Sequence, residues 1–508
     1  MVSNIISAGI FGIGGYKISV ECFLYSGLPS FDIVGLPGTS VRESRERVRA
    51  ALRNCGFTFP KGRITVNLAP ADTKKEGPLY DLPVLLGVLA ASGQIPPPPA
   101  GSAFIGELSL NGDMRPVNGV LPMALAARTA GVKSLFVPFE NAPEAALVDG
   151  IDVYACRHVM ELIRHINGER SLSSYRRSVR KEQKTALPDF ADVKSQDSVK
   201  RALEIAAAGN HNVLLIGPPG SGKSMLAKRL PSILPPLTSD EAMECTAIHS
   251  VAGLLSRDKP LLSDRPFRAP HHTVSVTGLS GGGTVPKPGE ITLAHNGVLF
   301  LDELPEFERR ALEILRQPIE EGSIVISRAA GTVTYPSRFL LVAAMNPCKC
   351  GWHGHPSHRC ICSRAQIDSY IGRISGPLLD RIDIIADVPS LDFDDLSRKP
   401  SGEPSAAIRK RVIAARSFAR DRYARYGLDE ITANAHLPSH LIQEFCKPDP
   451  SGLELLRSAF DRLGLTARSY DRVLRIARTI ADLEASAEIR AHHIAEALQF
   501  RNAGGKAL

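Results

Sequence analysis

Three short runs of apolar residues lie in the middle of the chain. They span Val213–Ile216, Val298–Leu301 and Phe339–Met345. Runs of this length without a polar interruption are typical of strands buried on both faces, as in a parallel sheet. Helical patterns lie beside the first run, at Ser198–Ala208 and at Met225–Leu230. Strands that alternate with helices predict an α/β core with a parallel sheet.

The first 168 residues have a different rhythm, in which strand and helix patterns do not alternate strictly. Strands are predicted at 18–23, 32–35, 64–68, 104–110 and 134–137, and helices at 41–54, 82–92 and 119–129. Asn111–Gly112 directly follows the 104–110 strand, and this dipeptide is typical of a tight hairpin turn. The pattern over residues 1–168 predicts an α+β domain.

Two changes of composition divide the rest of the chain. Residues 169–187 are polar and basic with no apolar period, which is typical of a linker; a plain tether and a segment that touches phosphates both fit. The α/β core follows at 188–390, and the segment 391–508 is helical. Its helices are predicted at 405–426, which is long and basic, and at 440–445, 452–463, 469–483 and 490–500, before a loose tail at 501–508.

Composition limits the class of protein. The chain has 508 residues, of which 44% are hydrophobic and 22% charged, as in an ordinary soluble globular protein of two to four domains. No segment approaches the roughly 18 consecutive apolar residues of a membrane span, and the N-terminus lacks the basic region of a secretion signal. We therefore expect a cytoplasmic protein with no membrane partner. The net charge of +8 fits an anionic partner, although a plain solvated surface can carry the same excess.

The loop after the first apolar run carries the strongest chemical signal. It matches G-x-x-x-x-G-K-[ST] at every fixed position, between a strand and a helix. Its residues are Gly217, Pro218, Pro219, Gly220, Ser221, Gly222, Lys223 and Ser224. Glycines allow backbone N–H groups to close around phosphates at the positive end of the following helix. Lys223 is expected to reach the β- and γ-phosphates of ATP, and the Ser224 hydroxyl to hold Mg²⁺.

Polar residues at the ends of the other two runs extend this nucleotide site. Asp302 and Glu303 follow the second run, about 80 residues after the phosphate loop. Asp302 is placed to hold the Mg²⁺ shell, and Glu303 to orient or deprotonate the attacking water. Asn346 ends the third run and can hydrogen-bond that water or the γ-phosphate; a plain cap of the strand end is the alternative. The motifs predict an ATPase.

Two further segments of the core place basic residues on loops or turns. The stretch 267–290 is rich in glycine and proline and contains Lys287; a stretch of this kind inside a compact domain is more often functional than filler. Two alternating runs between 323 and 335 flank Arg328–Gly331. This arrangement predicts a β-hairpin with a basic tip at Arg328.

Four of the nine cysteines lie close together. They are Cys348, Cys350, Cys360 and Cys362, in a C-x-C…C-x-C arrangement. Four thiolates suit tetrahedral zinc in a structural site, and they leave no open position for catalysis. His353, His355 and His358 lie between the cysteines as substitute ligands, and reduced thiols without a metal are the alternative.

Two segments of the first domain are similar to the proteolytic domain of Lon proteases, a fold shared with domain 2 of ribosomal protein S5. Gly106–Gly112 looks like the second half of that fold, and Lys75–Pro78 looks like the segment before its nucleophile. Leu79 stands where Lon has its serine, and the Lon lysine position falls near Leu121 or Pro122. None of these side chains can act as or activate a nucleophile. The resemblance therefore implies a Lon-like fold without peptidase activity.

Four longer motifs are distributed over the rest of the chain. They are APHHTVS at 269–275, GGGTVPKPGEITLAHNGVLFLDELPEF at 281–307, ISGPLLDRID at 374–383 and ARTIADL at 477–483. Together with the Lon-like domain they resemble the ComM or YifB family of magnesium-chelatase-like AAA+ ATPases. That family belongs to the helix-2-insert group, which also includes the MCM helicases.

This resemblance implies a hexameric helicase that drives branch migration, with single-stranded and branched DNA as its partners, in homologous recombination and natural transformation. Arg381 matches the arginine finger that reaches the γ-phosphate of the neighbouring subunit, and Arg373 is a weaker candidate. Arg468 matches the sensor-2 position of a helical lid. Arg328 and Lys287 are expected to face the ring channel and contact DNA phosphates.

Two other functions remain open. A magnesium chelatase subunit that inserts Mg²⁺ into a tetrapyrrole shares the core motifs, but the Lon-like domain and the cysteine cluster argue against it. A Lon-like peptidase is the other alternative, and the missing serine and lysine argue against that.

Overall fold

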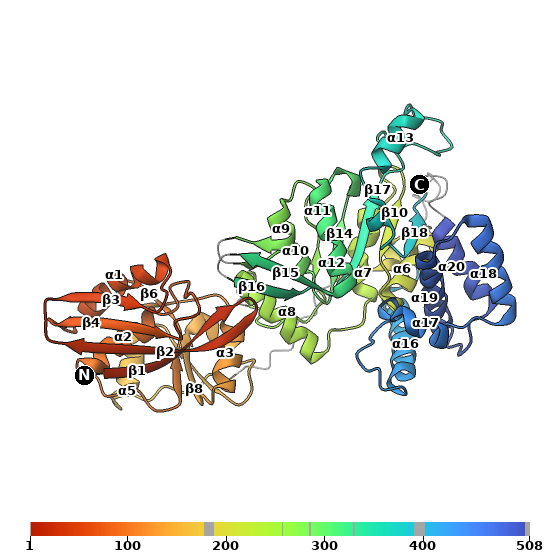
Figure 1. The fold of residues 1–508 in the computed structure, drawn as a ribbon. Coiled ribbons are helices and arrows are strands. Elements are labelled where there is room, and N and C mark those ends of the chain that lie inside the picture. The colour runs from red at the N-terminus through yellow and green to blue at the C-terminus, as the bar shows by residue number, and fades with distance from the viewer. Residues whose placement is uncertain are drawn as a thin grey trace.

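The computed structural model describes residues 2–176, 187–256, 258–283, 286–328, 331–390 and 402–502. Most of the predicted linker, with Arg177, Arg180, Lys181 and Lys184, lies outside these residues, as do 329–330 of the predicted hairpin tip and 503–508 of the predicted tail. Figure 1 shows an N-terminal domain, a central α/β domain and a C-terminal group of helices, arranged in chain order.

The N-terminal domain is built on a seven-stranded sheet of order β3-β4-β2-β1-β5-β8-β9. The strands are β1 (Val2–Phe11), β2 (Gly14–Tyr25), β3 (Ser30–Val34), β4 (Arg63–Ala69), β5 (Ser102–Phe104), β8 (Ser134–Pro138) and β9 (Asp152–Cys156). Its helices include α1 (Thr39–Asn54), α2 (Asp81–Ala91), α3 (Val120–Thr129), α4 (Ala142–Ala145) and α5 (Val159–Ile166). The strands around β2 pair antiparallel and β5, β8 and β9 pair parallel, which agrees with the predicted α+β rhythm.

One predicted strand of this domain is wrong. The segment 104–110 is divided into the end of β5 and the short β6 (Glu107–Leu108). Ile105 still donates its N–H to Phe136 of the neighbouring β8, but Gly106 donates to the carbonyl of Leu79, outside the sheet. β6 does form a hairpin with β7 (Met114–Arg115). Its connection covers residues 109–113 and is closed by the Ser109 N–H to Asp113 O bond, so the turn is longer than Asn111–Gly112 alone.

The central domain contains a five-stranded sheet of order β11-β14-β17-β10-β18, in which every neighbouring pair is parallel. The strands are β11 (Phe267–Arg268), β14 (Val298–Leu301), β17 (Leu340–Met345), β10 (Val213–Ile216) and β18 (Ile384–Asp387). The three predicted apolar strands are thus β10, β14 and β17. Because adjacent parallel strands end at one edge, the polar residues after them gather there.

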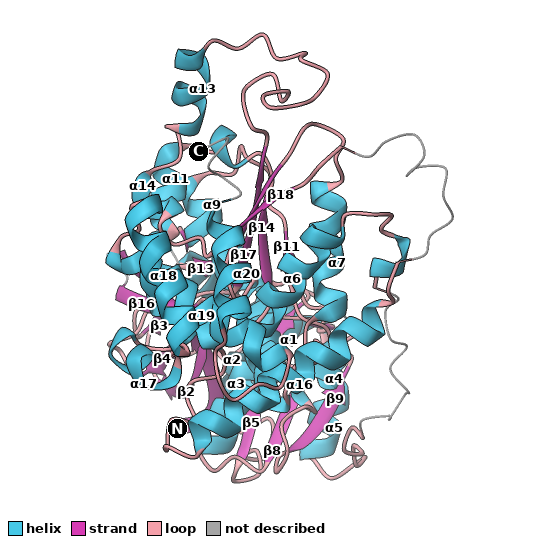
Figure 2. Cartoon of the chain, turned by 90° about the vertical axis from the view of Figure 1, so that its right-hand side faces the viewer, coloured by secondary structure: helices cyan, strands magenta, loops and turns pink. Residues whose placement is uncertain are grey.

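Alternate residues of these strands enter two hydrophobic cores. On β10, Val213 and Leu215 belong to one cluster, whereas Leu214 and Ile216 belong to the other. Helices α6 (Asp197–Gly209) and α7 (Lys223–Ile233) cover the first face, and α9 (Val276–Ser280), α10 (Glu290–Leu293), α11 (Arg309–Ile314) and α14 (Gly376–Leu379) contribute to the second. Figure 2 shows the strands between these helix layers. Burial on both faces explains why β10, β14 and β17 contain no polar residue.

The C-terminal helices continue the first core. They are α16 (Ser405–Ala424), α17 (Ser439–Phe445), α18 (Pro450–Leu463), α19 (Ala467–Leu483) and α20 (Ala491–Asn502), close to the predicted bounds. Buried residues of α16 and α19, such as Val412 and Ile476, lie in the same cluster as the sheet residue Val213. The lid and the α/β domain therefore share one hydrophobic core.

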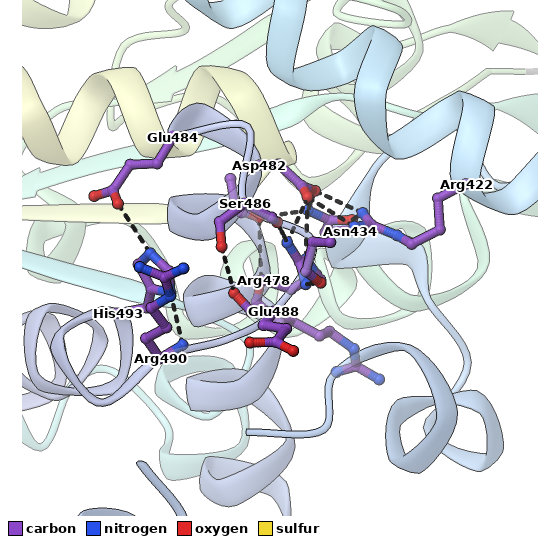
Figure 3. A network of polar contacts seen from close by, with 12 residues as sticks. Arg422, Asn434, Arg478, Asp482, Glu484, Ser486, Glu488, Arg490 and His493 are labelled. Atoms are coloured by element: carbon purple, nitrogen blue, oxygen red, sulfur yellow. Dashed lines mark hydrogen bonds and ion pairs between the residues drawn. The ribbon is translucent and has the colours of Figure 1, made fainter. Parts of the chain in front are cut away.

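A buried carboxylate organises the polar interior of the lid (Figure 3). Asp482 of α19 accepts two hydrogen bonds from Arg422, at 2.6 and 2.7 Å, and further bonds from Arg478 and Asn434 at 3.0 and 2.8 Å. Tyr423 donates to the Asn434 side-chain oxygen at 2.6 Å. Pairing with two arginines and an amide offsets the cost of burying this charge.

The N-terminal domain contacts the central domain at two places. Gly119 donates its N–H to the carbonyl of Ser250 in α8 (Ser239–Ala252) at 3.2 Å, and the Ser250 hydroxyl bonds the buried Glu144 carboxylate. The tip between β1 and β2 lies against the hairpin formed by β15 (Ser323–Arg328) and β16 (Gly331–Pro336), where a Cβ on Gly331 would lie 3.2 Å from Phe11. The first domain therefore touches both α8 and the basic hairpin.

Candidate nucleotide site and metal centre

The phosphate loop joins β10 to α7, and its backbone needs glycine at defined positions. Gly220 and Gly222 have φ of 77° and 88°, in the left-handed region that favours glycine. A Cβ on Gly217 would lie 2.3 Å from the carbonyl oxygen of Val388. Lys223 begins α7, so the loop ends at the positive N-terminus of a helix. The loop thus has the form that a triphosphate requires.

The Lys223 ammonium lies at the meeting point of the strand ends. It donates to the carbonyls of Gly217 and Pro218 at 2.7 and 2.9 Å and to the side-chain oxygen of Asn346 at 3.1 Å. Burial lowers the pKa of Lys223, and the nearby carboxylates of Asp302 and Glu303 partly oppose this effect. The structure therefore brings Asn346 beside Lys223, and the phosphate-binding role of Lys223 and the catalytic role of Asn346 stay predictions.

The two carboxylates after β14 lie across from the loop. The Ser224 hydroxyl donates to Asp302 at 2.5 Å, so the two predicted Mg²⁺ ligands are already adjacent. Asp302 also accepts the N–H of Glu303 at 3.0 Å. Glu303 adopts φ of 54°, a left-handed conformation, and its side chain is 54% exposed. A hydroxyl and a carboxylate suit Mg²⁺, and the role of Glu303 in handling water stays a prediction.

One neighbour of Glu303 was not singled out from the sequence. The Nδ1 atom of His272 lies 3.4 Å from the Glu303 carboxylate, and the His272 ring packs on His271 and edge-on against Phe307. His272 follows β11, the edge strand next to β14, which explains the contact. The His-His pair is visible within the 267–290 stretch, but nothing in the sequence pattern indicates that it contacts Glu303.

The three candidate arginines have different surroundings. Arg381 forms an ion pair with Glu320 and donates to the carbonyl of Pro377 at 2.6 Å. Arg373 is paired with Glu306 at 2.8 Å, beside the turn that follows Glu303. Arg468 is exposed in the first turn of α19. Within the described residues none of these contacts reaches the phosphate loop, and the finger and sensor roles stay predictions.

The four clustered cysteines converge between β17 and α13 (Arg364–Ile371). Sγ–Sγ distances are 3.3 Å from Cys348 to Cys350, 3.8 Å from Cys348 to Cys360 and 3.7 Å from Cys350 to Cys360. With Zn–S bonds of about 2.3 Å, a tetrahedral site has sulfur atoms about 3.8 Å apart, so the thiols fit the ion. Cys362 lies within 4.8 Å of the other three. The intervening histidines are not part of this group among the residues described.

One thiol of the group is shifted toward the form that binds a cation. Burial raises the pKa of Cys350, but the N–H groups of Trp352 and Ile361 and the thiols of Cys348 and Cys362 together outweigh it and lower the pKa to about 6. At Cys360 and Cys362 a backbone hydrogen bond also lowers the pKa, but burial and the neighbouring thiols outweigh it and raise the pKa of both. A thiolate is the form that binds zinc. A bound ion would tie Cys348, two residues after Asn346, to the start of α13, and four thiolate ligands would leave no open position for catalysis.

A second group of metal-ligand types occurs in the lid but is already internally bonded. The Nε2 atoms of His492 and His493 lie 3.1 and 3.0 Å from Glu484. The Nδ1 of His493 accepts the N–H of Arg490, so neutral His493 carries its proton on Nε2 and donates it to Glu484 (Figure 3). This arrangement explains the cluster without a metal.

The two predicted DNA contacts lie on neighbouring hairpins. Lys287 is in β13 (Lys287–Pro288), opposite Gly282 of β12 (Gly281–Gly282). A Cβ on Gly282 would lie 3.4 Å from the Arg328 guanidinium, so the end of β15 lies over this small hairpin. Both side chains are exposed. The structure therefore places two cations, remote in sequence, on one surface.

Three family comparisons match successive parts of the chain. The family described as magnesium chelatase, subunit ChlI, matches residues 189–396, subunit ChlI of Mg-chelatase matches 20–141, and magnesium chelatase, subunit ChlI C-terminal, matches 402–501. None of the described helices is long and apolar enough to cross a membrane.

Individual relatives match almost the whole chain. Competence protein ComM of Haemophilus influenzae is 44% identical over 499 residues, which cover 96% of this chain and 95% of that protein. The uncharacterized protein YifB of Escherichia coli is 43% identical over 492 residues, with the same two coverages of 96% and 95%. Lon protease 2 of Bacillus subtilis is 30% identical over 149 residues, 28% of this chain and 26% of that protein.

Proposed function

The chain belongs to the ComM/YifB family of magnesium-chelatase-like AAA+ proteins, and we propose that it is an ATP-driven DNA motor. The active form in this proposal is a hexameric ring whose ATP hydrolysis drives branch migration of recombining DNA. Single-stranded and branched DNA are its substrates, in homologous recombination and natural transformation. The similarity to competence protein ComM of Haemophilus influenzae supports a role with incoming DNA.

Residues around the phosphate loop supply the ATPase half of this function. The backbone N–H groups of 220–222 and the Lys223 ammonium hold the phosphates, which requires Lys223 to exchange its present carbonyl partners for phosphate oxygens. Ser224 and Asp302 hold Mg²⁺, whose charge stabilises the transferring phosphoryl group when bound.

Glu303 and Asn346 act on the attacking water in this proposal. Glu303 accepts the water proton, and Asn346 orients the water through its side-chain amide. Arg381 of one subunit neutralises developing charge at the γ-phosphate held by the next. Arg468, at the start of α19, contacts the nucleotide from the lid.

The DNA-binding part of the proposal rests on one observation, that Arg328 and Lys287 lie on the same surface. Each belongs to a different hairpin, yet the Arg328 guanidinium lies over Gly282, the strand partner of Lys287. Two exposed cations on projecting hairpins can track the phosphates of a strand without reading its bases. Sequence-independent contact of this kind is what a translocating motor requires.

The zinc centre has a supporting role in the proposal. Cys348 lies two residues after Asn346, and Cys362 is followed by the N-cap of α13 at Ser363. A closed site would fix the loop at the strand end where the water is handled. We therefore assign Zn²⁺ a structural function next to the nucleotide site.

A magnesium chelatase subunit is the alternative, favoured by the names of the three matching families. ATP hydrolysis separates the two functions when it is measured with Mg²⁺ in the presence and absence of single-stranded DNA. A DNA motor hydrolyses ATP several times faster with DNA, and Arg328→Ala reduces that stimulation. A rate that is unaffected by single-stranded and branched DNA at low salt would reject the DNA-motor proposal.

A further inference from the structure

The side chain of Arg381 is held inside its own chain. Its guanidinium is paired with Glu320 and bonded to the carbonyl of Pro377, and only 10% of the side chain is exposed. Asn212 donates to the backbone carbonyl of Arg381 at 3.1 Å and thereby fixes the position of its main chain. A guanidinium in this position cannot also contact a nucleotide on another subunit, so the side chain must move before it acts in trans.

In this position one polar atom of the Arg381 side chain has no hydrogen-bond partner among the described residues. That atom is Nε, which is buried. A buried N–H without a partner is unfavourable, which reduces the stability of the retained state. The ion pair with Glu320 therefore contributes much of what holds the guanidinium in place.

Glu320 is well placed to release Arg381. Its side chain is 55% exposed, so the carboxylate is rehydrated at little cost when the pair opens. It lies near the end of α12 (Arg316–Glu321), and only Glu321 and Gly322 separate it from β15. Gly322 has φ of 63° and forms the sharp connection between helix and strand. Movement of β15 is therefore transmitted directly to Glu320.

One surface cavity extends from Arg381 to the hairpin formed by β15 and β16. A cavity of about 660 Å³ is lined by α12, by β15 and by both Arg381 and Arg328. Arg328 is at the end of β15, and Glu320 is near its beginning. The hairpin proposed to contact DNA thus begins beside the residue that retains Arg381.

We infer that Glu320 is a positioning residue that holds Arg381 back in the resting subunit and releases it when the β15–β16 hairpin engages DNA. This inference rests on the proposed function, because Arg381 must act on a neighbouring subunit's nucleotide. It gives DNA-stimulated hydrolysis a defined route, from phosphate at Arg328 through β15 to Glu320 and then to Arg381. The partner that receives the released guanidinium is a second copy of this chain.

The test uses the full-length protein with the Glu320→Gln substitution, which keeps the shape of the side chain and removes its charge. The DNA-free ATPase rate is expected to rise about three- to fivefold, the upper range for an ion pair with one exposed partner. The KM for ATP should stay unchanged, because Lys223 and Ser224 are not affected. At saturating single-stranded DNA the variant should match the wild type, so the stimulation ratio falls.

Glu321→Gln is the matched control, since the Glu321 carboxylate accepts a bond from Gln317 at 2.8 Å instead of from Arg381. It should leave both rates at the wild-type value. A DNA-free rate of Glu320→Gln that is equal to or below that of the wild type would overturn the inference. So would a Glu320→Gln/Arg381→Ala double variant that is faster than Arg381→Ala alone.

Failure of the proposed function gives a different result. If DNA does not stimulate the wild type, the DNA motor is rejected, whereas a faster DNA-free rate of Glu320→Gln that depends on Arg381 still supports retention by Glu320. If DNA stimulates the wild type and Glu320→Gln alike, from equal basal rates, the motor stands and the role of Glu320 is rejected.

Discussion

Arg381→Ala mixed with Glu303→Gln tests whether the active sites are shared between subunits. Arg381→Ala removes a side chain whose described partners are Glu320 and the carbonyl of Pro377, neither of which belongs to the phosphate loop. It should therefore bind ATP normally and assemble. Loss of an arginine finger slows turnover by roughly a thousandfold or more. Glu303→Gln should also bind ATP and assemble, but it lacks the carboxylate that handles water.

The size of the expected rescue follows from the ring. Each proposed site combines the loop of one subunit with Arg381 of the next, so a site works when an Arg381→Ala subunit is followed by a Glu303→Gln subunit. In randomly mixed rings with equal amounts of the two, about one quarter of the interfaces have this order. ATPase activity should then approach about a quarter of the wild-type rate, which is about 250-fold above Arg381→Ala alone and about 25-fold above Glu303→Gln alone.

The assay is steady-state ATP hydrolysis over a series of mixing ratios, with mixed assembly verified by native mass spectrometry. Lys223→Ala in place of Glu303→Gln gives the same test with a donor that holds no nucleotide. Activity that stays at the single-variant level at every ratio, despite proven mixed rings, would refute action of Arg381 in trans.

Three further predictions concern the nucleotide, metal and DNA contacts. Lys223→Ala should lose ATP binding, whereas Glu303→Gln should bind ATP and lose turnover by about a hundredfold or more; equal ATPase rates in Glu303→Gln and wild type would reject the assignment. Purified protein should contain about one zinc per chain, and replacement of Cys348 and Cys350 by serine should remove it; elemental analysis below about a tenth of that content with zinc supplied would count against the site. Arg328→Ala should weaken binding of single-stranded DNA and lower the slope of log affinity against log salt by about 0.7 per lost contact, with basal ATPase largely kept; an unchanged slope in fluorescence anisotropy would remove Arg328 from the DNA surface.

Much of the nucleotide site was predictable because it depends on local patterns. Uninterrupted apolar runs identified β10, β14 and β17, and the parallel order of these strands brings their carboxyl ends to one edge. For this reason Lys223, Asp302 and Asn346, each placed from its own strand, are close together in the structure. The expected AAA+ α/β fold is confirmed by the family matches.

Contacts between remote segments were not predictable in the same way. The pair of Arg381 with Glu320 and the approach of His272 to Glu303 depend on how strands and helices pack, which no periodicity encodes. The strand expected at 104–110 is interrupted for a similar reason, since Gly106 donates its N–H to the carbonyl of Leu79, outside the sheet. Hydrophobic pattern determines the elements, whereas these partners are determined by tertiary packing.

Branch migration of a labelled four-way junction, with ATP and Mg²⁺, tests the central claim most directly. The account predicts that wild-type protein converts the junction to duplex products in an ATP-dependent reaction. The Glu303→Gln variant should bind the junction and leave it intact, because it holds ATP without hydrolysing it. Wild-type protein that hydrolyses ATP but leaves the junction unresolved at every protein concentration would contradict the account.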